Sequence, residues 1–461
     1  MLENRSFDHM LGYLQADGVL ADVDGLDPAT CFNEWPDGRK EYVAPMGDRY
    51  FHHKIQDPGH DAEDVKDQLA DRNGGFLKNY VEVLERHKQK WREEGKPIPP
   101  DTQMPPEAIL GYQQAHDVPV FDFIARTYHV CDKWFSSVPG PTWPNRLYAT
   151  TGGIADRVHV ALPGDLGEKL REAPIYDGEG FTRWLKKDQW RWYSHDPATL
   201  RMIDSAYRPG GDPDRYSDAN FAYFNRRTLL EWRTFLGDAS GGRLRRVSWI
   251  DPNFVDFRIL GPPGSSDDHP PSRVMLGQEL VLEILLAITR SRKTWERTLL
   301  LITYDEHGGF YDHVWPGDVA CPGEEGFPLG VRVPALVVSP WVPQGVSHTT
   351  FDHTAIIKTV LEAVADEKGR SDAYAKMGPR VRAANDLGDL LSLDAPREPP
   401  RDELYALADT VVKWKRAAYE RNMLEAPTRG EEGWEAVTDL QSEIVAAANK
   451  LRADGIPPGK P

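Results

Sequence analysis

Two adjacent carboxylates, Asp305 and Glu306, follow an apolar run in the stretch TLLLITYDEHGGFYDH at residues 298–313. The apolar residues 299–302 and the β-branched and aromatic residues after them favour a strand buried on both faces, as in a parallel sheet. Carboxylates at such a strand end need a positive partner, and ligands of α/β sheets bind at this end. Carboxylate oxygens suit Mg²⁺, Ca²⁺ or Mn²⁺, and a neighbouring imidazole admits Zn²⁺ or iron. The alternative is that both carboxylates cap a turn and face water.

A second candidate for chemistry is Thr142, in the stretch SSVPGPTWPNRLYATTGG at residues 136–153. Pro144 suits the first turn of a helix, where its missing N–H costs nothing, and Gly152 and Gly153 are typical of a helix end. Thr142 is therefore expected at a helix N-terminus, where free N–H groups and the helix dipole favour an anion such as phosphate. The alternative is that Thr142 is only an N-cap, a position in which threonine is common.

Apolar strands alternate with helices along most of the chain. Strands are expected at residues 128–135, 190–193, 244–251, 299–304 and 331–339, with helices at 145–150, 180–187, 274–291 and 351–365. This alternation predicts the α/β class, with a mostly parallel central sheet and helices on both faces. Residues 195–240 favour an insertion over the active-site end of the sheet. Residues 401–448 hold two amphipathic helices, which we expect to form a short helical C-terminal appendage.

The composition limits the kinds of partner. The 461 residues include 55 Lys and Arg against 72 Asp and Glu, a formal charge of −17, which argues against a nucleic-acid-binding surface. Cys31, Cys131 and Cys321 are too widely spaced for a CxxC zinc motif or a disulfide framework. There is no apolar run long enough for a transmembrane segment, and the start MLENRSFDHM shows no signal peptide. We expect a soluble protein and leave its compartment and oligomeric state open.

Three segments, taken together and in this order, resemble one family. They are ENRSFDH at residues 3–9, GPTWPNR at 140–146 and TYDEHGGFYDHV at 303–314. The combination resembles the phosphoesterase family of bacterial phosphatidylcholine-cleaving phospholipases C, together with the related respiratory-burst-inhibiting acid phosphatase. Further similar segments are DPGHD around His60, DHPPSRVMLGQE at 268–279 and SPWVPQGVSHTTFDHTAIIKTVLE at 339–362.

The resemblance implies an alkaline-phosphatase-like α/β fold and one divalent metal ion, whose identity stays open among Ca, Mg, Mn, Zn and Fe. The metal ligands that it implies are Glu3, Asn4, Thr142, Asp305 and Glu306. It also implies that Thr142 is the nucleophile and that His60 and His269 contact the phosphoryl group, while Asn145 is a weaker candidate from the same motif. The other motif histidines are interpreted as structural, with hydrogen bonds for His307 and His313 and a helix-capping role for His353.

These residue types fit phosphoester hydrolysis. A threonine hydroxyl is a poor nucleophile until a bound cation lowers its pKa, and it can then attack phosphorus to give a phosphothreonine that water hydrolyses. The helix N-terminus and the two histidines would neutralise the developing charge, with His269 the first candidate for general acid. A phospholipase C-like phosphodiesterase acting on phosphate esters, phospholipids included, is the favoured interpretation.

The open alternatives are an acid phosphomonoesterase and an inactive binding protein that keeps the fold. A sulfatase-like esterase is disfavoured, because GPTWPNR lacks the Cys- or Ser-x-Pro-x-Arg pattern of sulfatases. The chain also departs from the family pattern, since only Met1 and Leu2 precede the first motif, where the family has an apolar strand. We expect this first strand and any export signal to be missing here, and Glu3 and Asn4 to be held less firmly. The expected domains are a catalytic domain at 1–398 and a helical extension at 399–461.

Overall fold

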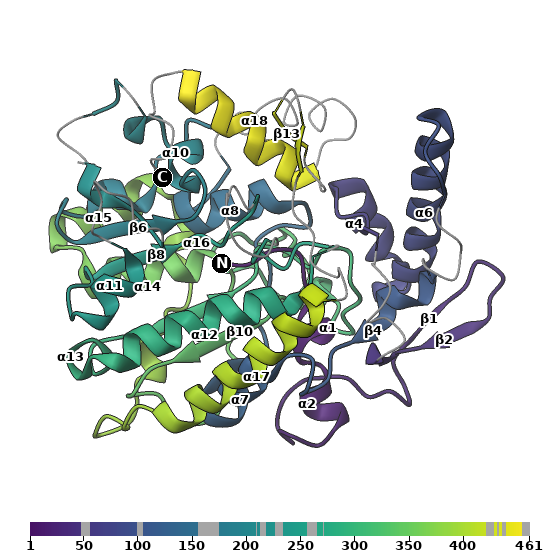
Figure 1. Cartoon of the computed structure of the whole chain (residues 1–461), viewed down its shortest axis with the longest axis horizontal. Coiled ribbons are helices and arrows are strands. Elements are labelled where there is room, and N and C mark those ends of the chain that lie inside the picture. The colour runs from purple at the N-terminus through teal and green to yellow at the C-terminus, as the bar shows by residue number, and fades with distance from the viewer. Residues whose placement is uncertain are drawn as a thin grey trace.

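The structure is a computed structural model of the chain (Figure 1). It describes residues 1–47, 56–98, 105–154, 175–208, 210–212, 218–225, 234–255, 265–270, 272–420, 428–430, 433–435 and 439–453. The α-helices are α1 (Phe7–Leu11), α2 (Tyr13–Ala16), α4 (Ala62–Gln68), α5 (Ala70–Asn73), α6 (Phe76–Glu93), α7 (Pro119–Thr127), α8 (Thr142–Thr151), α10 (Thr199–Ile203), α11 (Phe235–Ser240), α12 (Val274–Arg290), α13 (Arg292–Trp295), α14 (Thr354–Val364), α15 (Glu367–Lys376), α16 (Gly378–Ala383), α17 (Arg401–Glu420) and α18 (Asp439–Ala453). The strands are β1 (Phe32–Glu34), β2 (Lys40–Tyr42), β3 (Ala44–Pro45), β4 (Gly111–Tyr112), β5 (His129–Cys131), β6 (Trp190–Ser194), β7 (Phe221–Tyr223), β8 (Val247–Ile250), β9 (Leu300–Thr303), β10 (Ala335–Val338), β11 (Gly345–Ser347), β12 (Thr428–Gly430) and β13 (Gly433–Glu435).

The central sheet of the described chain is mixed in direction. Its strand order is β11, β5, β10, β9, and β10 runs antiparallel to both of its neighbours, with Leu336 paired to Val130 on one side and to Ile302 on the other. β11 runs parallel to β5. The expectation of a mostly parallel central sheet is therefore corrected for these strands. The run ALVV in β10 is buried at every position. Such a run can be buried equally well in a parallel or an antiparallel strand, so its apolar pattern does not determine the direction of pairing.

A second sheet is parallel throughout the described residues. Its order is β7, β6, β8, and both neighbours of β6 run parallel to it. All five residues of β6 (WRWYS) are buried, and Trp192 stacks on Trp249 of β8 with ring centroids 4.6 Å apart. β7 lies within residues 195–240, so part of the expected insertion supplies a strand to this sheet.

Helices cover the sheets and complete an α/β organisation, which confirms the expected class. The apolar helix α12 packs against α7, α11 and α17, and α7 in turn contacts β5 and β10. Figure 1 shows α12 and α17 running side by side across the front of the view, while α6 extends at the right edge. Leu280, Leu285 and Ile288 of α12 belong to the same buried cluster as Leu336 and Val337 of β10.

The C-terminal helices α17 and α18 pack on the body of the molecule. The Lys415 ammonium of α17 lies 2.5 Å from Glu279 of α12. Leu440 and Ile444 of α18 are buried in a cluster with Trp143 of α8. The division into domains at residue 398 stays a prediction.

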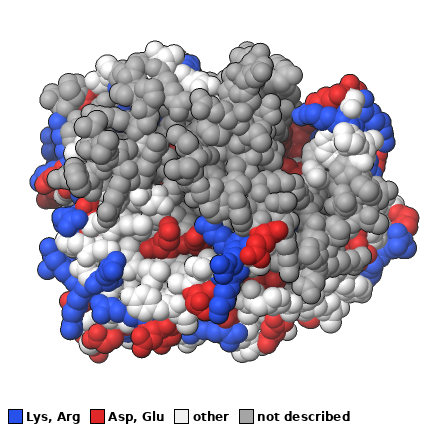
Figure 2. Space-filling view, in the orientation of Figure 1, with Lys and Arg blue, Asp and Glu red and all other residues white. Residues whose placement is uncertain are grey.

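Charges of both signs are interspersed over the described surface of the face drawn in Figure 2. The excess of negative charge is therefore not gathered into one patch on the described part of this face. Among the described residues, none of the helices combines the length and the apolar character needed to cross a membrane.

Candidate active site

Strand β9, last in the order of the four-stranded sheet, delivers Asp305 to a buried position, and the first residues of the chain lie beside it. Leu2 forms a parallel bridge with Tyr304: the Leu2 N–H donates to Thr303 O at 2.8 Å, and the Asp305 N–H donates to Leu2 O at 3.1 Å. These bonds carry Glu3 to the carboxyl end of β9, where its side chain is fully buried. The expectation that Glu3 and Asn4 are loosely held is thus wrong for this structure, because one bridging residue suffices to hold them.

Helix α8 brings Thr142 to the same point. Thr142 is the first helical residue after the cap Pro141, and the helix ends at Gly152 with a positive φ of 77°. Thr142 is therefore inside the first turn and not an N-cap. Its hydroxyl lies 3.2 Å from Glu3 Oε2 and 3.4 Å from Asn4 Oδ1, so three of the expected ligands are in contact.

The backbone conformation at Asn4 places its N–H against the carboxylate of Asp305. Asn4 has a φ of 57°, a conformation that asparagine tolerates better than most residues, and its N–H donates to Asp305 Oδ1 at 3.1 Å. The same oxygen accepts the Glu306 N–H at 2.7 Å. A Cβ at Gly308 would lie 2.2 Å from Asn4 O, so only glycine lets the two segments approach this closely.

Arg146, which the sequence analysis did not single out, lies among these carboxylates. Its guanidinium forms an ion pair with Glu3, and its Nε lies 3.3 Å from Asp305 Oδ2, with all three side chains buried. The signal was present in the sequence: Arg146 follows Thr142 by four residues, and residues four apart share one face of a helix. Arg146 thus supplies a positive charge that the buried carboxylates need.

The two carboxylates titrate as a pair. Burial raises the pKa of Glu3 well above its ordinary value, against the opposing charge of Arg146, and the nearby Asp305 raises it further. Burial alone would also raise the pKa of Asp305, but the hydrogen bond with Glu3 and the charge of Arg146 lower it. One positive charge, that of Arg146, thus faces two buried carboxylates, which favours a proton or a further cation beside the pair.

The donor set fits a hard divalent cation. Asp305 Oδ2 and Glu306 Oε1 are buried oxygens that lack a hydrogen-bond partner among the described residues. Such oxygens are costly unless a positive group binds them. Carboxylate, amide and hydroxyl oxygens are the ligands that Mg²⁺, Ca²⁺ and Mn²⁺ prefer. Glu3, Asn4, Thr142 and Asp305 would hold the ion, with Glu306 next to them in sequence at the same strand end.

His60 and His269 lie together, as expected. Their ring centroids are 5.7 Å apart in an edge-to-face arrangement. Although burial opposes it, the negative charges of Glu306, Asp57 and Asp61 raise the pKa of His60 to about 10. Burial lowers the pKa of His269, and the charge of His60 lowers it further. At neutral pH His60 is therefore the charged ring and His269 the neutral one, so the resting structure favours His60, not His269, as the holder of the proton.

A family model described as Phosphoesterase family matches residues 1–364. The chain belongs to the Phosphoesterase family. The family expected from the three motifs is thereby confirmed.

Relatives in this family are named as phospholipases C. Non-specific phospholipase C6 of Arabidopsis thaliana is 30% identical over 391 residues, which cover 78% of this chain and 66% of that protein. Phospholipase C B of Mycobacterium tuberculosis is 26% identical over 450 residues, covering 88% of this chain and 78% of that protein. The chain thus matches slightly less than two thirds of the length of the plant relative.

The solved structures include a protein in the alkaline phosphatase superfamily from Vibrio parahaemolyticus. It is 11% identical with a TM-score of 0.33 and covers 69% of this chain and 84% of that chain. The α/β class of this chain therefore rests on the strands and helices described above, and not on this similarity.

The loop that carries His269 is held in place by residues of two family motifs, ENRSFDH at 3–9 and TYDEHGGFYDHV at 303–314. Arg5 donates through Nε to Asp268 O at 2.9 Å, and the Tyr304 hydroxyl donates to Asp268 Oδ2 at 2.6 Å. Asp268 has a φ of 74°, which is uncommon for a residue other than glycine. Glu3 adds a bond from its N–H to Asp267 O at 2.7 Å. In the sequence, Asp268 stood out only as the first residue of the family-like segment 268–279, with no sign of these contacts.

Asn145 lies behind Thr142 and binds backbone. Its Oδ1 accepts the Val138 N–H at 3.0 Å, and its Nδ2 donates to Gly140 O at 3.0 Å and to Pro141 O at 3.1 Å. The side chain is fully buried. This geometry assigns Asn145 to holding the loop that precedes Thr142, whereas the sequence placed it among the catalytic candidates.

The remaining motif histidines make structural contacts. His307 Nε2 lies 2.7 Å from Gln68 Oε1. His353 stands at the N-cap position of α14, but its side chain makes no capping bond; its Nε2 lies 2.5 Å from Asp305 O. The expected capping role of His353 is therefore replaced by support of the residue that ends β9.

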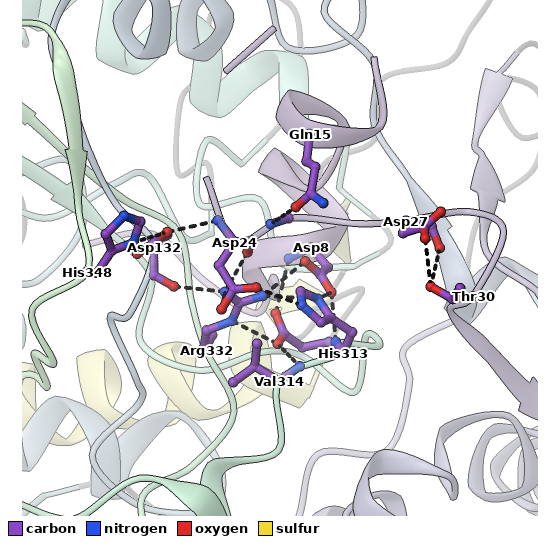
Figure 3. Close-up of polar contacts among 12 residues, drawn as sticks. Asp8, Gln15, Asp24, Asp27, Thr30, Asp132, His313, Val314, Arg332 and His348 are labelled. Atoms are coloured by element: carbon purple, nitrogen blue, oxygen red, sulfur yellow. Dashed lines mark hydrogen bonds and ion pairs between the residues drawn. The ribbon is translucent and has the colours of Figure 1, made fainter. Parts of the chain in front are cut away.

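His313 belongs to a network of charged side chains around the buried Arg332 (Figure 3). Its Nδ1 lies 2.7 Å from Asp8 Oδ2 and its Nε2 lies 3.1 Å from Asp24 Oδ1. Arg332, fully buried, pairs with Asp8 at 3.1 Å and with Asp312 at 2.9 Å. Arg332 Nη1 also donates to the backbone oxygens of Asp24 and Asp132, each at 2.8 Å. These contacts support the structural interpretation of His313.

Proposed function

We propose that the chain hydrolyses phosphate esters through Thr142, with a phospholipase C-like diester as the favoured substrate. The observation that carries the proposal is the Thr142 hydroxyl at the N-terminus of α8, in contact with Glu3 and Asn4 beside the buried carboxylate of Asp305. Membership of the Phosphoesterase family and relatives named as phospholipases C support it.

A divalent cation held by Glu3, Asn4, Thr142 and Asp305 would lower the pKa of the threonine hydroxyl and stabilise negative charge on the phosphoryl oxygens. The chain's own residues orient the hydroxyl and favour binding of the phosphoryl group. Glu3 accepts the hydrogen bond of the hydroxyl and so orients it. Free N–H groups in the first turn of α8 favour the anionic phosphoryl group in front of Thr142.

In the first half of the proposed reaction, the Thr142 hydroxyl releases its proton to solvent, Thr142 Oγ1 bonds to phosphorus, and the bond from phosphorus to the leaving oxygen breaks. The product is a phosphothreonine. His60, whose pKa is raised to about 10, carries positive charge at neutral pH and is placed to neutralise the phosphoryl oxygens. The leaving oxygen takes a proton from the His60–His269 pair, because His60 holds that proton in the resting state.

In the second half, water attacks phosphorus and the bond from phosphorus to Thr142 Oγ1 breaks, which returns Thr142 to the deprotonated form that attacked. His269, whose pKa is lowered, is the neutral ring and can accept the proton of that water. The two rings thereby serve opposite proton transfers, which requires that their pKa values differ in the direction found here. The sequence-based choice of His269 as general acid is revised in this proposal to a pair in which His60 carries the proton.

The test measures turnover of p-nitrophenyl phosphate and p-nitrophenyl phosphorylcholine across a series of divalent cations. Thr142→Ala should lower turnover on the order of 10⁶-fold, as for removal of another hydroxyl nucleophile. Thr151→Ala is the matched control, since Thr151 lies at the far end of α8 and bonds only backbone oxygens. Preference for the phosphorylcholine ester would support the diester proposal, and preference for the simple phosphate would favour a phosphomonoesterase.

Turnover by Thr142→Ala close to that of Thr151→Ala would overturn the nucleophile assignment. A wild-type protein that binds a divalent cation but turns over neither ester would favour the inactive binding protein.

A further inference from the structure

Three side chains with metal-binding atoms converge outside the oxygen-rich site. They are Asp57, His60 and His269, and one ligand atom from each lies within 4.8 Å of the others. They come from segments far apart in sequence, the loop before α4 and the loop before α12. Asp57 is not among the metal ligands proposed above, and those ligands bind through oxygen atoms, not through imidazole nitrogens.

The hydrogen bonds of the two rings suit metal binding. His60 Nδ1 lies 2.8 Å from Pro58 O, and His269 Nδ1 lies 2.7 Å from Pro270 O. Because each Nδ1–H donates to a carbonyl, Nε2 is the nitrogen left to bind a cation, which in His60 would replace the proton on Nε2. Histidines that bind metals typically donate their other ring N–H to a backbone carbonyl in this way, which fixes the ring and the tautomer.

The surroundings favour an added positive charge. His269 is buried, and the His60 and Asp57 side chains are only 19% and 22% exposed. Glu306 and Asp61 add negative charge next to His60. Among the described residues, Asp8, Asp312 and His313 form another group of three possible ligands, with two carboxylates and one imidazole, but there the buried guanidinium of Arg332 already supplies the positive charge (Figure 3).

We propose that Asp57, His60 and His269 form a second cation site that takes a borderline transition metal such as Zn²⁺. Two imidazoles and one carboxylate select Zn²⁺ or Co²⁺ over Mg²⁺ and Ca²⁺, which prefer the all-oxygen set around Thr142. Three protein ligands also leave the fourth position of a tetrahedral Zn²⁺ open to water or to a phosphoryl oxygen.

The site has a consequence for activity, and this part of the inference rests on the proposed function. A cation bound to both Nε2 atoms removes the two rings from proton transfer at the phosphoryl group. Excess Zn²⁺ should therefore inhibit an enzyme whose oxygen-rich site is already filled by Mg²⁺, Ca²⁺ or Mn²⁺. Inhibition by Zn²⁺ and binding of Zn²⁺ should depend on the same three residues.

The experiment titrates Co²⁺ and Zn²⁺ into the full chain held at saturating Mg²⁺. Co²⁺ is followed by its visible absorption, which is much stronger for tetrahedral nitrogen-containing sites than for octahedral oxygen sites. Zn²⁺ is followed by competition with a chromogenic chelator. The variants are Asp57→Asn, which removes one ligand, and Asp61→Asn, which removes a nearby charge that also acts on His60 but lies outside the ligand group.

We expect the wild type and Asp61→Asn to show the tetrahedral Co²⁺ band and to bind Zn²⁺, and Asp57→Asn to lose the band. Each protein's turnover is compared with its own rate without Zn²⁺, and Asp57→Asn should need at least about tenfold more Zn²⁺ for the same inhibition, since one ligand is lost.

Equal Co²⁺ spectra and equal Zn²⁺ binding in the wild type and Asp57→Asn would overturn the second site. His60→Gln provides a further check, because a Zn²⁺ equivalent retained by that variant would also contradict the proposal. If the wild type lacks turnover while the Co²⁺ band still depends on Asp57, the proposed function fails and the cation site stands.

Discussion

At the scale of single residues, the site depends on balancing buried charge. Glu3 and Asp305 are both fully buried, and Arg146 is the guanidinium that contacts both. Breaking a buried ion pair by removing one partner leaves an uncompensated charge, which is strongly destabilising. The same two carboxylates would also bind a divalent cation. In the holoenzyme, the guanidinium of Arg146 and the cation would together neutralise Glu3 and Asp305.

Arg146→Met should therefore destabilise the metal-free protein by about 3–5 kcal/mol. Saturating divalent cation should reduce this loss, because the cation compensates the charge that the guanidinium no longer neutralises. The measurement is urea unfolding of both proteins with and without the cation. Arg126→Met is the control, since Arg126 forms an exposed ion pair with Asp122 that is worth no more than about 1 kcal/mol. A loss that is identical with and without cation would contradict this account.

Asp305→Ala tests the oxygen-rich site directly. Removing this carboxylate takes away two oxygens at the end of β9, one of which lacks a hydrogen-bond partner in the described structure. Both bound metal and turnover should be lost, and metal content after dialysis measures the first of these. Asp318→Ala is a suitable control, because Asp318 is exposed and pairs with Arg72 on the surface. Full metal content in Asp305→Ala would exclude Asp305 as a ligand.

At the scale of elements, the end of β9 controls the loop that carries His269. Tyr304 is the last residue before Asp305, and its hydroxyl donates to the buried carboxylate of Asp268. Gly277, in the first turn of α12, donates its N–H to the other oxygen at 3.1 Å. One carboxylate thus joins a strand, a loop and a helix, and burial raises its pKa to about 7.

Tyr304→Phe should loosen this loop while keeping the shape of the core. Loss of one donor to a buried acceptor costs about 1–3 kcal/mol, and the displaced His269 should lower kcat more than it changes KM. Thermal unfolding and steady-state kinetics on the same preparation measure both effects. In Tyr374→Phe, the hydroxyl removed bonds Glu362 at a partly exposed site, so little change is expected. An unchanged kcat in Tyr304→Phe would show that this bond does not position His269.

Local features of these elements could be predicted from the sequence, because they depend on neighbouring residues. Ser6 caps α1 by accepting the His9 N–H, as its position before an apolar helix suggests, and Gly152 ends α8. The motifs likewise identified Glu3, Thr142 and Asp305, which the structure brings together.

Pairing between distant elements could not be predicted. The direction of β10 relative to β5 and β9 depends on how the intervening chain returns, and an apolar run looks the same in either direction. The contacts of Arg146 with Glu3 and of Tyr304 with Asp268 also join residues far apart in sequence. A single sequence contains no distance information of this kind, so the partners of a buried charge emerge only with the fold.

At the scale of the whole molecule, the network around Arg332 connects segments near the start of the chain with segments more than 300 residues later. Asp8 comes from α1, Asp24 from the following loop, Asp132 from the end of β5 and His348 from the segment after β11 (Figure 3). His348 Nδ1 lies 2.9 Å from Asp132 Oδ2. Since α1 follows Glu3 and Asn4 directly, the network anchors the segment that supplies two of the proposed ligands.

The pH dependence of stability should report this network. The charge of Asp8 and the hydrogen bond to Asp24 raise the pKa of His313 to about 10, outweighing burial. A group whose pKa is raised on folding stabilises fully below its ordinary value of 6.5 and loses that contribution as the pH rises toward 10. The pKa of Asp24 is lowered to about 2, chiefly by its hydrogen bond to His313, so its contribution is complete above the ordinary value of 3.8.

The combined contribution should therefore be greatest between these two ordinary values, at about pH 4–6, and should decline as the pH rises. His313→Gln removes it, so the difference in unfolding free energy between wild type and variant should be large at pH 5.5 and small at pH 10. Urea unfolding at both values measures this difference. His116→Gln is the control, because His116 is mostly exposed and close only to Asp117, and its difference should stay small at both values. A His313→Gln difference that does not fall with rising pH would mean that His313 contributes through packing and not through its charge.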